Sequence, residues 1–429
     1  MSQQGPILVV SSASRPSFAA TLDGAGLFPV VETGWADAAR AVEQVQPAAV
    51  LAAASQTDAA GLTELAARVA ARQPYLPLIA VDPQMAYPDN VIPFFQSQVL
   101  QSQVLQSQVL QNHVPHTQQA GCDRLMARLR AVLRVRALHA TVMRRLVPAA
   151  PMTLSQIDPA RDATVLLIGR GGAYPALSVA LGERSGVVGA LSIEAAAKHL
   201  NTRDIDGIVL GEGFSLRVVD AFLTVLTEDS RFRNLPVVVT AGDLAPAYDL
   251  ANLEIVSGDA AQVATTVLPL IRQHAFEAHL SRTLKAIDAD GLIDARTGLL
   301  TAEAFERDFA SAIYQTQQRG GGLSVARFAF DPDHPRAQFD GARIISRLMR
   351  QMDFGAAQDD GSVVVVFAEA DLKTAHAVAR RLSSVMRHTS HGQRDARSEP
   401  SVTVATLLPN DSAKSLRSRL QEGAQRAAS

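Results

Sequence analysis

Short apolar runs alternate with amphipathic stretches along the first part of the chain. Residues 7–10, 49–52 and 76–81 are mostly apolar runs between polar or turn-forming residues, a pattern typical of strands that are buried on both faces of a sheet. Between them, residues 36–45 and 62–71 are rich in Ala and Leu at helical spacing. Strands that alternate with helices predict a doubly wound parallel α/β sheet.

The same alternation begins again after residue 160. Residues 164–168, 207–210 and 235–240 are apolar runs that predict a second, flavodoxin-like parallel sheet. A helix is predicted over residues 268–286, with Pro269 in its first turn, where a proline is tolerated. This helix either packs within its own domain or pairs with its copy in a dimer, and its spacing fits both alternatives.

The first domain is predicted to end in an amphipathic helix over residues 123–138. Its apolar stripe consists of Leu125, Leu129, Val132 and Leu133. Its arginines are expected on the opposite, exposed face. Ahead of this helix, an insert at residues 96–117 contains Gln-Ser-Gln-Val-Leu three times. A period of five residues fits neither a helix nor a strand, so the insert is interpreted as a low-complexity loop, with a partner-binding segment as the alternative.

The pattern changes at about residue 292 to an α+β arrangement. Strands are predicted over residues 323–330, 363–367 and 402–408, and helices after Thr301, over 341–352 and 372–388, and from Ala413. The predicted organisation is two α/β domains at residues 1–147 and 160–275, a linker helix at 276–291, and an α+β domain at 292–429.

Composition narrows the classes of function. The chain has 429 residues, 47% hydrophobic and 19% charged, which suits core-forming globular domains. Its formal net charge of -2 provides no basic field for nucleic acid or an anionic membrane. Cys122 is the only cysteine, so neither an internal disulfide nor a cysteine metal cluster is expected. Without a signal-peptide pattern or an apolar run of about 18 residues, the expectation is a soluble cytoplasmic protein with no membrane span.

Both α/β domains resemble receiver domains of response regulators, but they lack the residues for phosphorylation. A receiver needs an acidic pair after strand one, a phosphoacceptor Asp after strand three, a Thr or Ser after strand four and a Lys after strand five. Its carboxylates hold the Mg²⁺ that neutralises the phosphoryl group. The first domain has Ser11 and Ser12, Ala53, Asp82 and Ile92 at these positions.

The second domain lacks the same residues. Gly169-Arg170-Gly171 follows its first strand, Gly211 stands at the phosphoacceptor position, and only Thr240 remains. Asp58 and Glu212 are alternative acceptors, but Mg²⁺ has no site without the acidic cluster. Both domains are therefore interpreted as degenerate receivers that act as adaptor or dimerisation modules.

The α+β domain resembles the GGDEF domains of diguanylate cyclases. Asp294-Ala-Arg-Thr-Gly-Leu299 is similar to the family's entry motif Asp-x-Leu-Thr-Gly-Leu. The resemblance places Ala329 where the family has a metal-binding Asp, and Asp331 at a second Asp position. The path from Asp331 to Arg350 is shorter than in the family, and the guanine-reading residues of that segment are missing.

The family's Gly-Gly-Asp/Glu-Glu-Phe signature is replaced by Asp359-Asp360-Gly361-Ser362-Val363. A cyclase needs metal-bound carboxylates to neutralise a triphosphate, and glycines where the backbone approaches it. Two Asp side chains put bulk and negative charge there instead. A new metal site formed by Asp331, Asp359 and Asp360 is the alternative to a solvated acidic turn. The sequence therefore predicts a pseudo-diguanylate cyclase with no catalytic residues, metal or cofactor.

Arg350-Gln-Met-Asp353 matches the family's inhibitory site for cyclic di-GMP, in the same register to the signature position, and the resemblance adds Arg381 on the next helix. An arginine can fork onto a phosphate or onto guanine O6 and N7, and an aspartate can accept from guanine N1–H and N2–H. The alternative is an exposed ion pair worth about 0–1 kcal/mol. Weaker candidates are Arg347, His376 and Arg380.

The order receiver–receiver–GGDEF resembles response-regulator diguanylate cyclases of the PleD type and, more closely, their catalytically silent relatives. The resemblance implies a non-catalytic cyclic di-GMP receptor that binds its ligand at Arg350, Asp353 and Arg381 and forms homodimers through its receiver domains. It also implies that the chain recruits protein adaptors or protease-delivery partners in cell-cycle signalling, in the cytoplasm or at a cell pole. Two alternatives stay open: a scaffold or dimerisation protein that binds no nucleotide, and a residual diguanylate cyclase.

Overall fold

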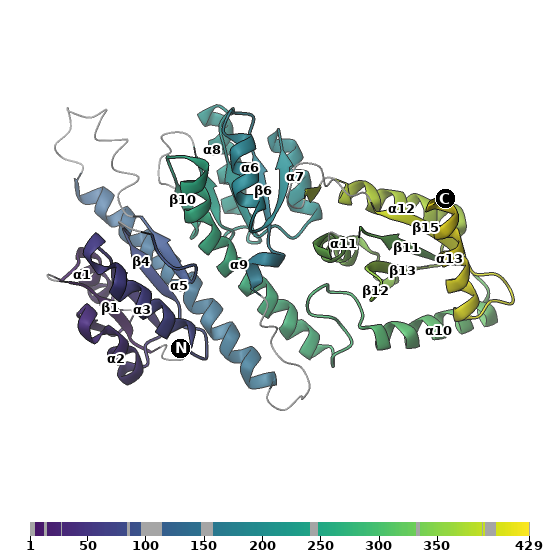
Figure 1. Cartoon of the computed structure of the whole chain (residues 1–429), viewed down its shortest axis with the longest axis horizontal. Helices are drawn as coiled ribbons and strands as arrows, with labels where there is room; N and C mark the ends of the chain where they lie inside the picture. The colour runs from purple at the N-terminus through teal and green to yellow at the C-terminus, as the bar shows by residue number, and fades with distance from the viewer. Residues whose placement is uncertain are drawn as a thin grey trace. The chain divides into compact units, whose positions relative to one another are not determined.

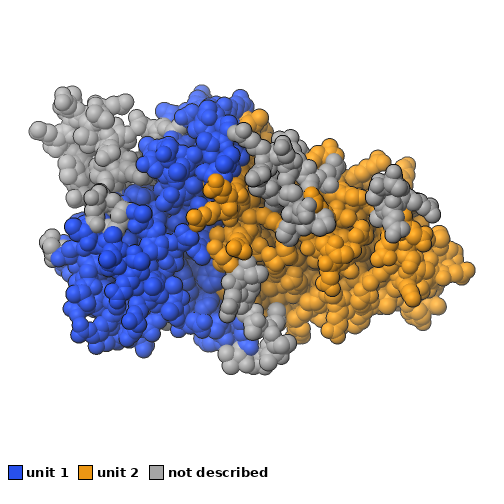
Figure 2. Space-filling view, in the orientation of Figure 1, with its two compact units in different colours: residues 1–153, 167–180, 206–277 blue, residues 154–166, 181–205, 278–429 orange. Residues whose placement is uncertain are grey.

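The structure is a computed structural model. It describes residues 5–12, 15–26, 28–83, 86–95, 114–146, 158–240, 248–331, 335–387, 389–390 and 400–428. Two compact units divide the chain, one of residues 1–153, 167–180 and 206–277, the other of residues 154–166, 181–205 and 278–429 (Figure 2). The predicted insert lies outside the described residues up to residue 113, and its last four residues belong to a helix that begins at Val114.

The first sheet is parallel and five-stranded. Its strands are β1 (Ile7–Val10), β2 (Val30–Thr33), β3 (Ala49–Ala53), β4 (Leu78–Val81) and β5 (Val91–Phe94). Their order is β2-β1-β3-β4-β5, which is the flavodoxin-like order. The accompanying helices are α1 (Ser17–Gly24), α2 (Trp35–Val45), α3 (Ala59–Ala70) and α5 (Val114–Leu146) (Figure 1). The predicted parallel α/β architecture is confirmed here, and the strands missed from sequence include β2, whose residues are only partly buried.

The second sheet repeats this strand order. It contains β6 (Thr164–Ile168), β7 (Gly186–Ala190), β8 (Gly207–Leu210), β9 (Val237–Val239) and β10 (Leu253–Ile255), in the order β10-β9-β8-β6-β7. The helices are α6 (Tyr174–Gly182), α7 (Ile193–Thr202), α8 (Leu216–Glu228) and α9 (Ala260–Asp288). A short strand that no pattern predicted, β14 (Thr389–Ser390), pairs antiparallel with β7.

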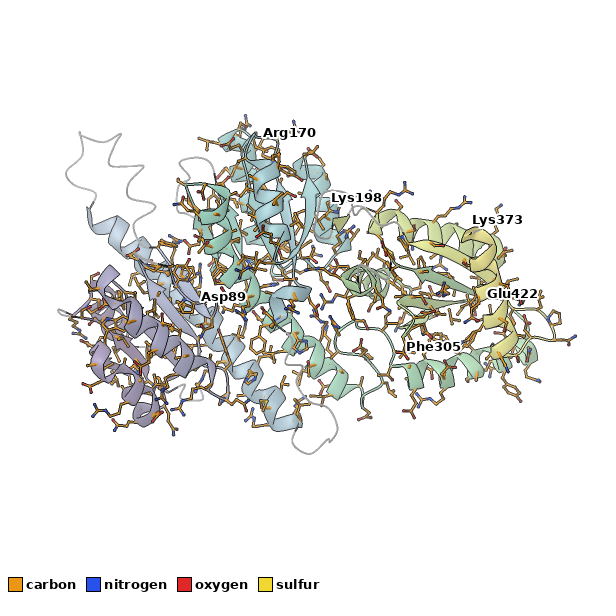
Figure 3. The ribbon with its side chains drawn as sticks, viewed as in Figure 1. Asp89, Arg170, Lys198, Phe305, Lys373 and Glu422 are labelled. Atoms are coloured by element: carbon orange, nitrogen blue, oxygen red, sulfur yellow. The ribbon has the colours of Figure 1, made fainter. Side chains whose placement is uncertain are left out.

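The C-terminal sheet is antiparallel and covered on both faces. Its order is β12 (Phe354–Ala357), β13 (Ser362–Ala368), β11 (Leu323–Ala329) and β15 (Ser401–Thr406). One face packs under α11 (Pro335–Leu348) and α12 (Leu372–Met386), and the other under α10 (Ala302–Arg319) and α13 (Ala413–Ala428). Successive side chains of β13 enter opposite cores, as the two-residue period of a strand requires. Phe305, labelled in Figure 3, stacks on Phe309 at 5.6 Å between ring centroids.

The long helix α9 corrects the predicted helix over 268–286. It begins at Ala260, so Pro269 lies inside it and not in the first turn. A proline at this position cannot donate to the carbonyl of Thr265 one turn earlier. The hydroxyl of Tyr87 donates to that carbonyl at 3.3 Å, and burial raises the pKa of Tyr87 to about 12, which keeps the donor protonated. The lost backbone bond is therefore replaced by one from a side chain.

The long helix α5 shows that one prediction about its arginines is wrong. Leu125 and its stripe partners are buried as expected, but Arg128 is fully buried as well. Its guanidinium donates to a carboxylate oxygen of Glu254 at 2.8 Å and to the carbonyls of Ala251 and Pro93 at 2.9 and 3.2 Å. The arginine joins the ends of β5 and β10 and does not face solvent.

The apolar residues of α9 show what the first half of this helix packs against. Leu270 is buried in the same core as Leu125 and Leu129 of α5. This core belongs to the first α/β domain, so the first half of α9 packs against that domain of the same chain, a contact that neither alternative included. Among the described residues, no helix is both long and apolar enough to cross a membrane.

Candidate ligand-binding site

The turn after α11 holds the predicted Arg350-x-x-Asp353 motif. The backbone N–H of Asp353 donates to the carbonyl of Arg350 at 3.0 Å, and β12 begins directly afterwards. Asp353 as a whole residue is only 9% exposed, and its carboxylate accepts the backbone N–H of Ala368, at the end of β13, at 3.2 Å. Burial raises the pKa of Asp353, while backbone hydrogen bonds from Ala368 and Arg350 and the charge of Arg350 oppose the shift. One carboxylate oxygen thus fastens the turn to the sheet.

The two arginines of the predicted site are exposed. Arg350 follows α11 and Arg381 lies on α12, the two helices that cover the same face of the sheet. In the part of the chain that the structure describes, neither guanidinium makes a hydrogen bond or an ion pair with a side chain. The structure therefore leaves two exposed arginines on this side of the domain and a largely buried aspartate three residues after one of them, without joining the three in one contact.

Of the three weaker candidates, one has an ion-pair partner in the structure and the other two are exposed on α12. Arg347 donates to the carboxylate of Asp204 at 2.7 Å and is half-buried. His376 and Arg380 are exposed on α12. Arg347 therefore has a structural partner already, whereas His376 and Arg380 remain accessible.

The position of the lost signature is a tight β-hairpin turn. Gly361 has a φ of 78°, which glycine adopts without a steric cost, and the N–H of Gln358 donates to the carbonyl of Ser362 at 2.8 Å. Asp360 accepts from Arg327 of β11 at 2.9 Å and from the Ser362 hydroxyl at 2.5 Å. Partial burial disfavours its charge, but these hydrogen bonds outweigh burial and lower the pKa of Asp360.

The other predicted cyclase positions lie beside this turn. Ala329 ends β11 and is paired with Ser362, so a methyl group stands where the resemblance calls for a metal ligand. Asp331 is exposed two residues further on. The described residues contain no group of three or more His, Cys, Asp or Glu side chains that could hold a metal ion.

The entry motif of the domain forms an anchor that the sequence did not predict. Asp294 accepts the N–H groups of Arg296 and Thr297, and Gly298 has a φ of 76°. This turn directs the Arg296 guanidinium onto Asp162, with which it forms two hydrogen bonds of 2.9 Å. Arg343 of α11 donates to the Asp162 carbonyl at 2.8 Å. The sequence does show that Asp162, before β6, and Arg296, in the motif, carry opposite charges. Opposite charges alone do not indicate which residues pair.

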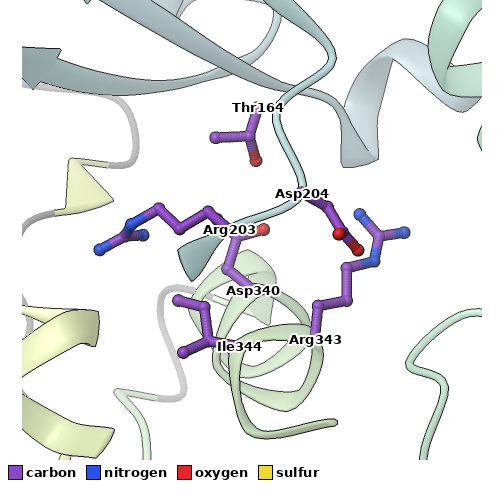
Figure 4. Close-up of a pocket in the computed structure, with 6 residues that line it drawn as sticks. All are labelled: Thr164, Arg203, Asp204, Asp340, Arg343 and Ile344. Carbon is purple, nitrogen blue, oxygen red and sulfur yellow. The ribbon is translucent and has the colours of Figure 1, made fainter. Parts of the chain in front are cut away.

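Two further arginines connect α11 to the residue before β6 and α12 to the residue after α7. Arg336 donates to the carbonyl of Ala163 and Arg203 to that of Val385. Burial lowers the pKa of Arg203 to about 10, against the opposing charge of Asp340. A pocket at this contact is lined by Thr164, Arg203, Asp204, Asp340, Arg343 and Ile344 (Figure 4). Its open volume of about 10 Å³ has room for one water molecule, so it does not accommodate a dinucleotide.

Acid is expected to weaken the anchor through Asp162. Partial burial raises its pKa, but the hydrogen bonds and charge of Arg296 and the charges of Arg343 and Arg336 outweigh burial and hold the pKa of Asp162 below the usual value of an aspartate. A carboxyl group whose pKa is lower in the folded than in the unfolded protein stabilises the fold at pH values above its unfolded-state pKa. This stabilisation is lost as the pH falls through its folded-state pKa. Asp162→Asn should therefore cost about 2 kcal/mol near neutral pH and flatten the loss of stability below pH 4. Urea unfolding between pH 3 and pH 7 measures both, and an unchanged pH profile in the variant would contradict this role.

The receiver-like positions of the first domain hold no cation-binding cluster in the described residues. Asp58 accepts from the hydroxyls of Ser12 and Ser55 at 2.8 and 2.5 Å. Burial disfavours its charge, but these hydrogen bonds lower its pKa. Ile92 is buried in β5. The alternative acceptor Asp58 is therefore the cap of the turn after β3, bonded across to the end of β1.

In the second domain, the surviving Thr240 hydroxyl donates to the carbonyl of Leu210 at 3.4 Å. The Arg170 N–H donates to the Glu212 carbonyl at 3.0 Å, which closes the ends of β6 and β8 together, and the Glu212 side chain is exposed. Gly211 leaves no side chain at the phosphoacceptor position.

Comparisons with known proteins find similarity to solved GGDEF domains. No family model and no curated protein matches the chain. The coiled coil and GGDEF domain of DgcB from Caulobacter crescentus, in complex with c-di-GMP, is 17% identical, covers 35% of this chain and 86% of its own, and has a TM-score of 0.28. The FimX GGDEF domain from Pseudomonas aeruginosa is 18% identical, with coverages of 32% and 93% and a TM-score of 0.29. Diguanylate cyclase SiaD from the same organism, in complex with its activator SiaC, is 15% identical, with coverages of 34% and 64% and a TM-score of 0.29. At these identities and scores, none of the three indicates what this chain binds or catalyses.

Proposed function

We propose that this chain is a non-catalytic receptor for cyclic di-GMP, with Arg350, Asp353 and Arg381 as its binding residues. The observation that carries the proposal is the Arg350-x-x-Asp353 turn. Its Arg350 guanidinium is exposed and makes no hydrogen bond or salt bridge to the described side chains, and its Asp353 carboxylate is held in place by the N–H of Ala368. A cyclic dinucleotide has two phosphates that arginines can fork onto. A carboxylate can accept several hydrogen bonds, so Asp353 can also accept from guanine N–H groups.

The absence of catalysis is part of the same proposal. At the signature position, Asp360 neutralises Arg327 and caps the hairpin turn, and Ala329 offers no ligand for a metal. A triphosphate would meet the charges of Asp359 and Asp360 there without a cation between them. These features support a pseudo-diguanylate cyclase and argue against the residual cyclase.

The biological role follows from the resemblance of the domain order. We infer a response regulator of the PopA-like kind, with degenerate receivers, that dimerises and recruits adaptor or protease-delivery proteins in cell-cycle control. Binding of cyclic di-GMP would determine whether those proteins bind to this chain. The identity of the partner proteins does not follow from any residue.

Calorimetric titration of the full chain tests the receptor proposal. Cyclic di-GMP is expected to bind with measurable heat, and GTP with Mg²⁺ is expected neither to bind nor to be converted to product. No heat from cyclic di-GMP would refute the receptor, and formation of cyclic di-GMP from GTP would refute the non-catalytic assignment.

A scaffold that binds no nucleotide is the second candidate, because one observation favours it. Asp353 is nearly fully buried and already accepts a hydrogen bond from Ala368. This is what a purely structural aspartate at a turn would do. The calorimetric titration separates the two candidates directly.

A further inference from the structure

Helix α8 exposes an apolar seam that the chain itself does not cover within the described residues. Val218 and Val225 are 40% and 60% exposed, and Ala221 between them is exposed too. Their spacing of three and four residues places them in one line along the helix. Single exposed apolar side chains are ordinary, but among the described helices α8 alone has more than one large exposed apolar side chain.

The polar side chains along the seam leave it open to close contact. The hydroxyl of Thr224 donates to the carbonyl of Asp220 at 2.9 Å, so its hydrogen bond is satisfied within the helix. The carboxylate of Asp220, to the side of the seam, accepts from Tyr248. Small side chains at residues 221 and 224 permit a second helix to approach closely, as packing between helices requires.

The charges at the two ends of α8 oppose the helix dipole. Arg217 is exposed in the first turn and Glu228 in the last, and the helix has no acidic residue in its first turn and no basic residue in its last. A cation near a helix N-terminus and an anion near a C-terminus are each locally unfavourable. An antiparallel neighbour with the same sequence would place Arg217 next to the Glu228 of the second copy, and would do so twice.

We propose that α8 is the contact between two copies of this chain, which form an antiparallel, two-fold symmetric dimer along the Val218–Ala221–Val225 seam. A two-fold axis between residues 222 and 223 pairs residue 217 of each copy with residue 228 of the other and brings Ala221 against Thr224. A self-complementary patch of this kind closes after two copies. This surface is independent of the nucleotide site.

Charge exchange tests the pairing in the full chain. Sedimentation velocity should show a dimer for the wild type. Arg217→Glu and Glu228→Arg should each raise the dissociation constant about tenfold or more, because two attractive contacts become repulsive. An equimolar mixture of the two variants should recover the dimer, since the mixed pair restores both attractions, and so should the double variant.

Two controls complete the experiment. Arg130→Glu, an exposed arginine of α5, makes the same change in net charge and should leave dimerisation unchanged. Val225→Asp should abolish dimerisation while circular dichroism stays that of the wild type. A monomeric wild type, single variants that dimerise like the wild type, or a mixture that stays monomeric would each overturn the proposal.

Discussion

Replacing Arg128 with alanine is expected to lower the free energy of unfolding by about 3–5 kcal/mol, because the change leaves the carboxylate of Glu254 buried without its main partner. Glu254 is 1% exposed, and its other ion-pair partner among the described residues is Arg124, at 3.2 Å. Two backbone carbonyls, of Ala251 and Pro93, lose their donor at the same time. A loss of this size is a large part of the stability of a typical domain.

Urea unfolding measures the effect, with Trp35 as the fluorescent probe because it is the only tryptophan and packs at the edge of the first core. Arg130→Ala is the matched control, since Arg130 is exposed two residues along the same helix. The double change Arg128→Met and Glu254→Met should recover most of the loss, because apolar residues of similar volume can replace a buried ion pair. If Arg128→Ala cost no more than Arg130→Ala, the burial of this pair would be contradicted.

The sequence predicted the strands well because their signal is local. Residues 7–10, 49–53, 164–168 and 207–210 form strands where continuous apolar runs occur, and burial on both faces makes such runs necessary. Of the described strands, β2, β5, β7, β10, β12 and β14 escaped prediction. For β2 and β14 the reason is the opposite one. Glu32 and Thr33 in β2 and the polar pair of β14 have no apolar pattern, so only their neighbours in the sheet define them.

The ion pair of Arg128 was not predictable from helical periodicity. The spacing places Arg128 three residues after Leu125 and four before Val132, on the apolar side of α5, and Arg130 on the opposite side, and Arg128 is indeed buried and Arg130 exposed. The spacing does not reveal the partner, Glu254, which lies more than a hundred residues away along the chain. The same holds for Asp162, whose partners Arg296 and Arg343 lie far along the chain.

At the candidate site, too, features set by neighbouring residues were predictable and features set by distant residues were not. The register of Arg350 and Asp353 relative to the hairpin was readable, and the structure has a turn there, followed by a hairpin at residues 358–362. The burial of Asp353 could not be predicted, because its hydrogen-bonding partner, the N–H of Ala368, lies at the far end of β13. The two arginines are exposed, whereas the aspartate is buried and stabilises the turn.

This difference between the residues sets the expectations for their substitution. Asp353→Ala should lower stability as well as binding, because it removes the acceptor of the Ala368 N–H. Loss of binding by that variant would therefore be ambiguous. The Arg350 guanidinium makes no hydrogen bond to the described residues, and the backbone hydrogen bonds of Arg350 do not depend on its side chain, so Arg350→Ala should leave the fold unchanged and report on the ligand alone.

Arg350→Ala is expected to weaken cyclic di-GMP binding about 100-fold, since a forked hydrogen bond from a guanidinium to a phosphate or guanine is worth about 3 kcal/mol. Arg350→Lys should recover part of the affinity, because it keeps the charge but not the fork. Arg381→Ala should have a smaller effect, as expected of a residue contributed by a neighbouring helix, and Arg319→Ala, at the exposed end of α10, should have none. Calorimetry on all four variants, with their melting temperatures as the check on folding, makes the comparison. Equal affinities for the wild type and Arg350→Ala would place the ligand elsewhere on the chain, and a loss shared equally by Arg319→Ala would reduce the effect to general charge.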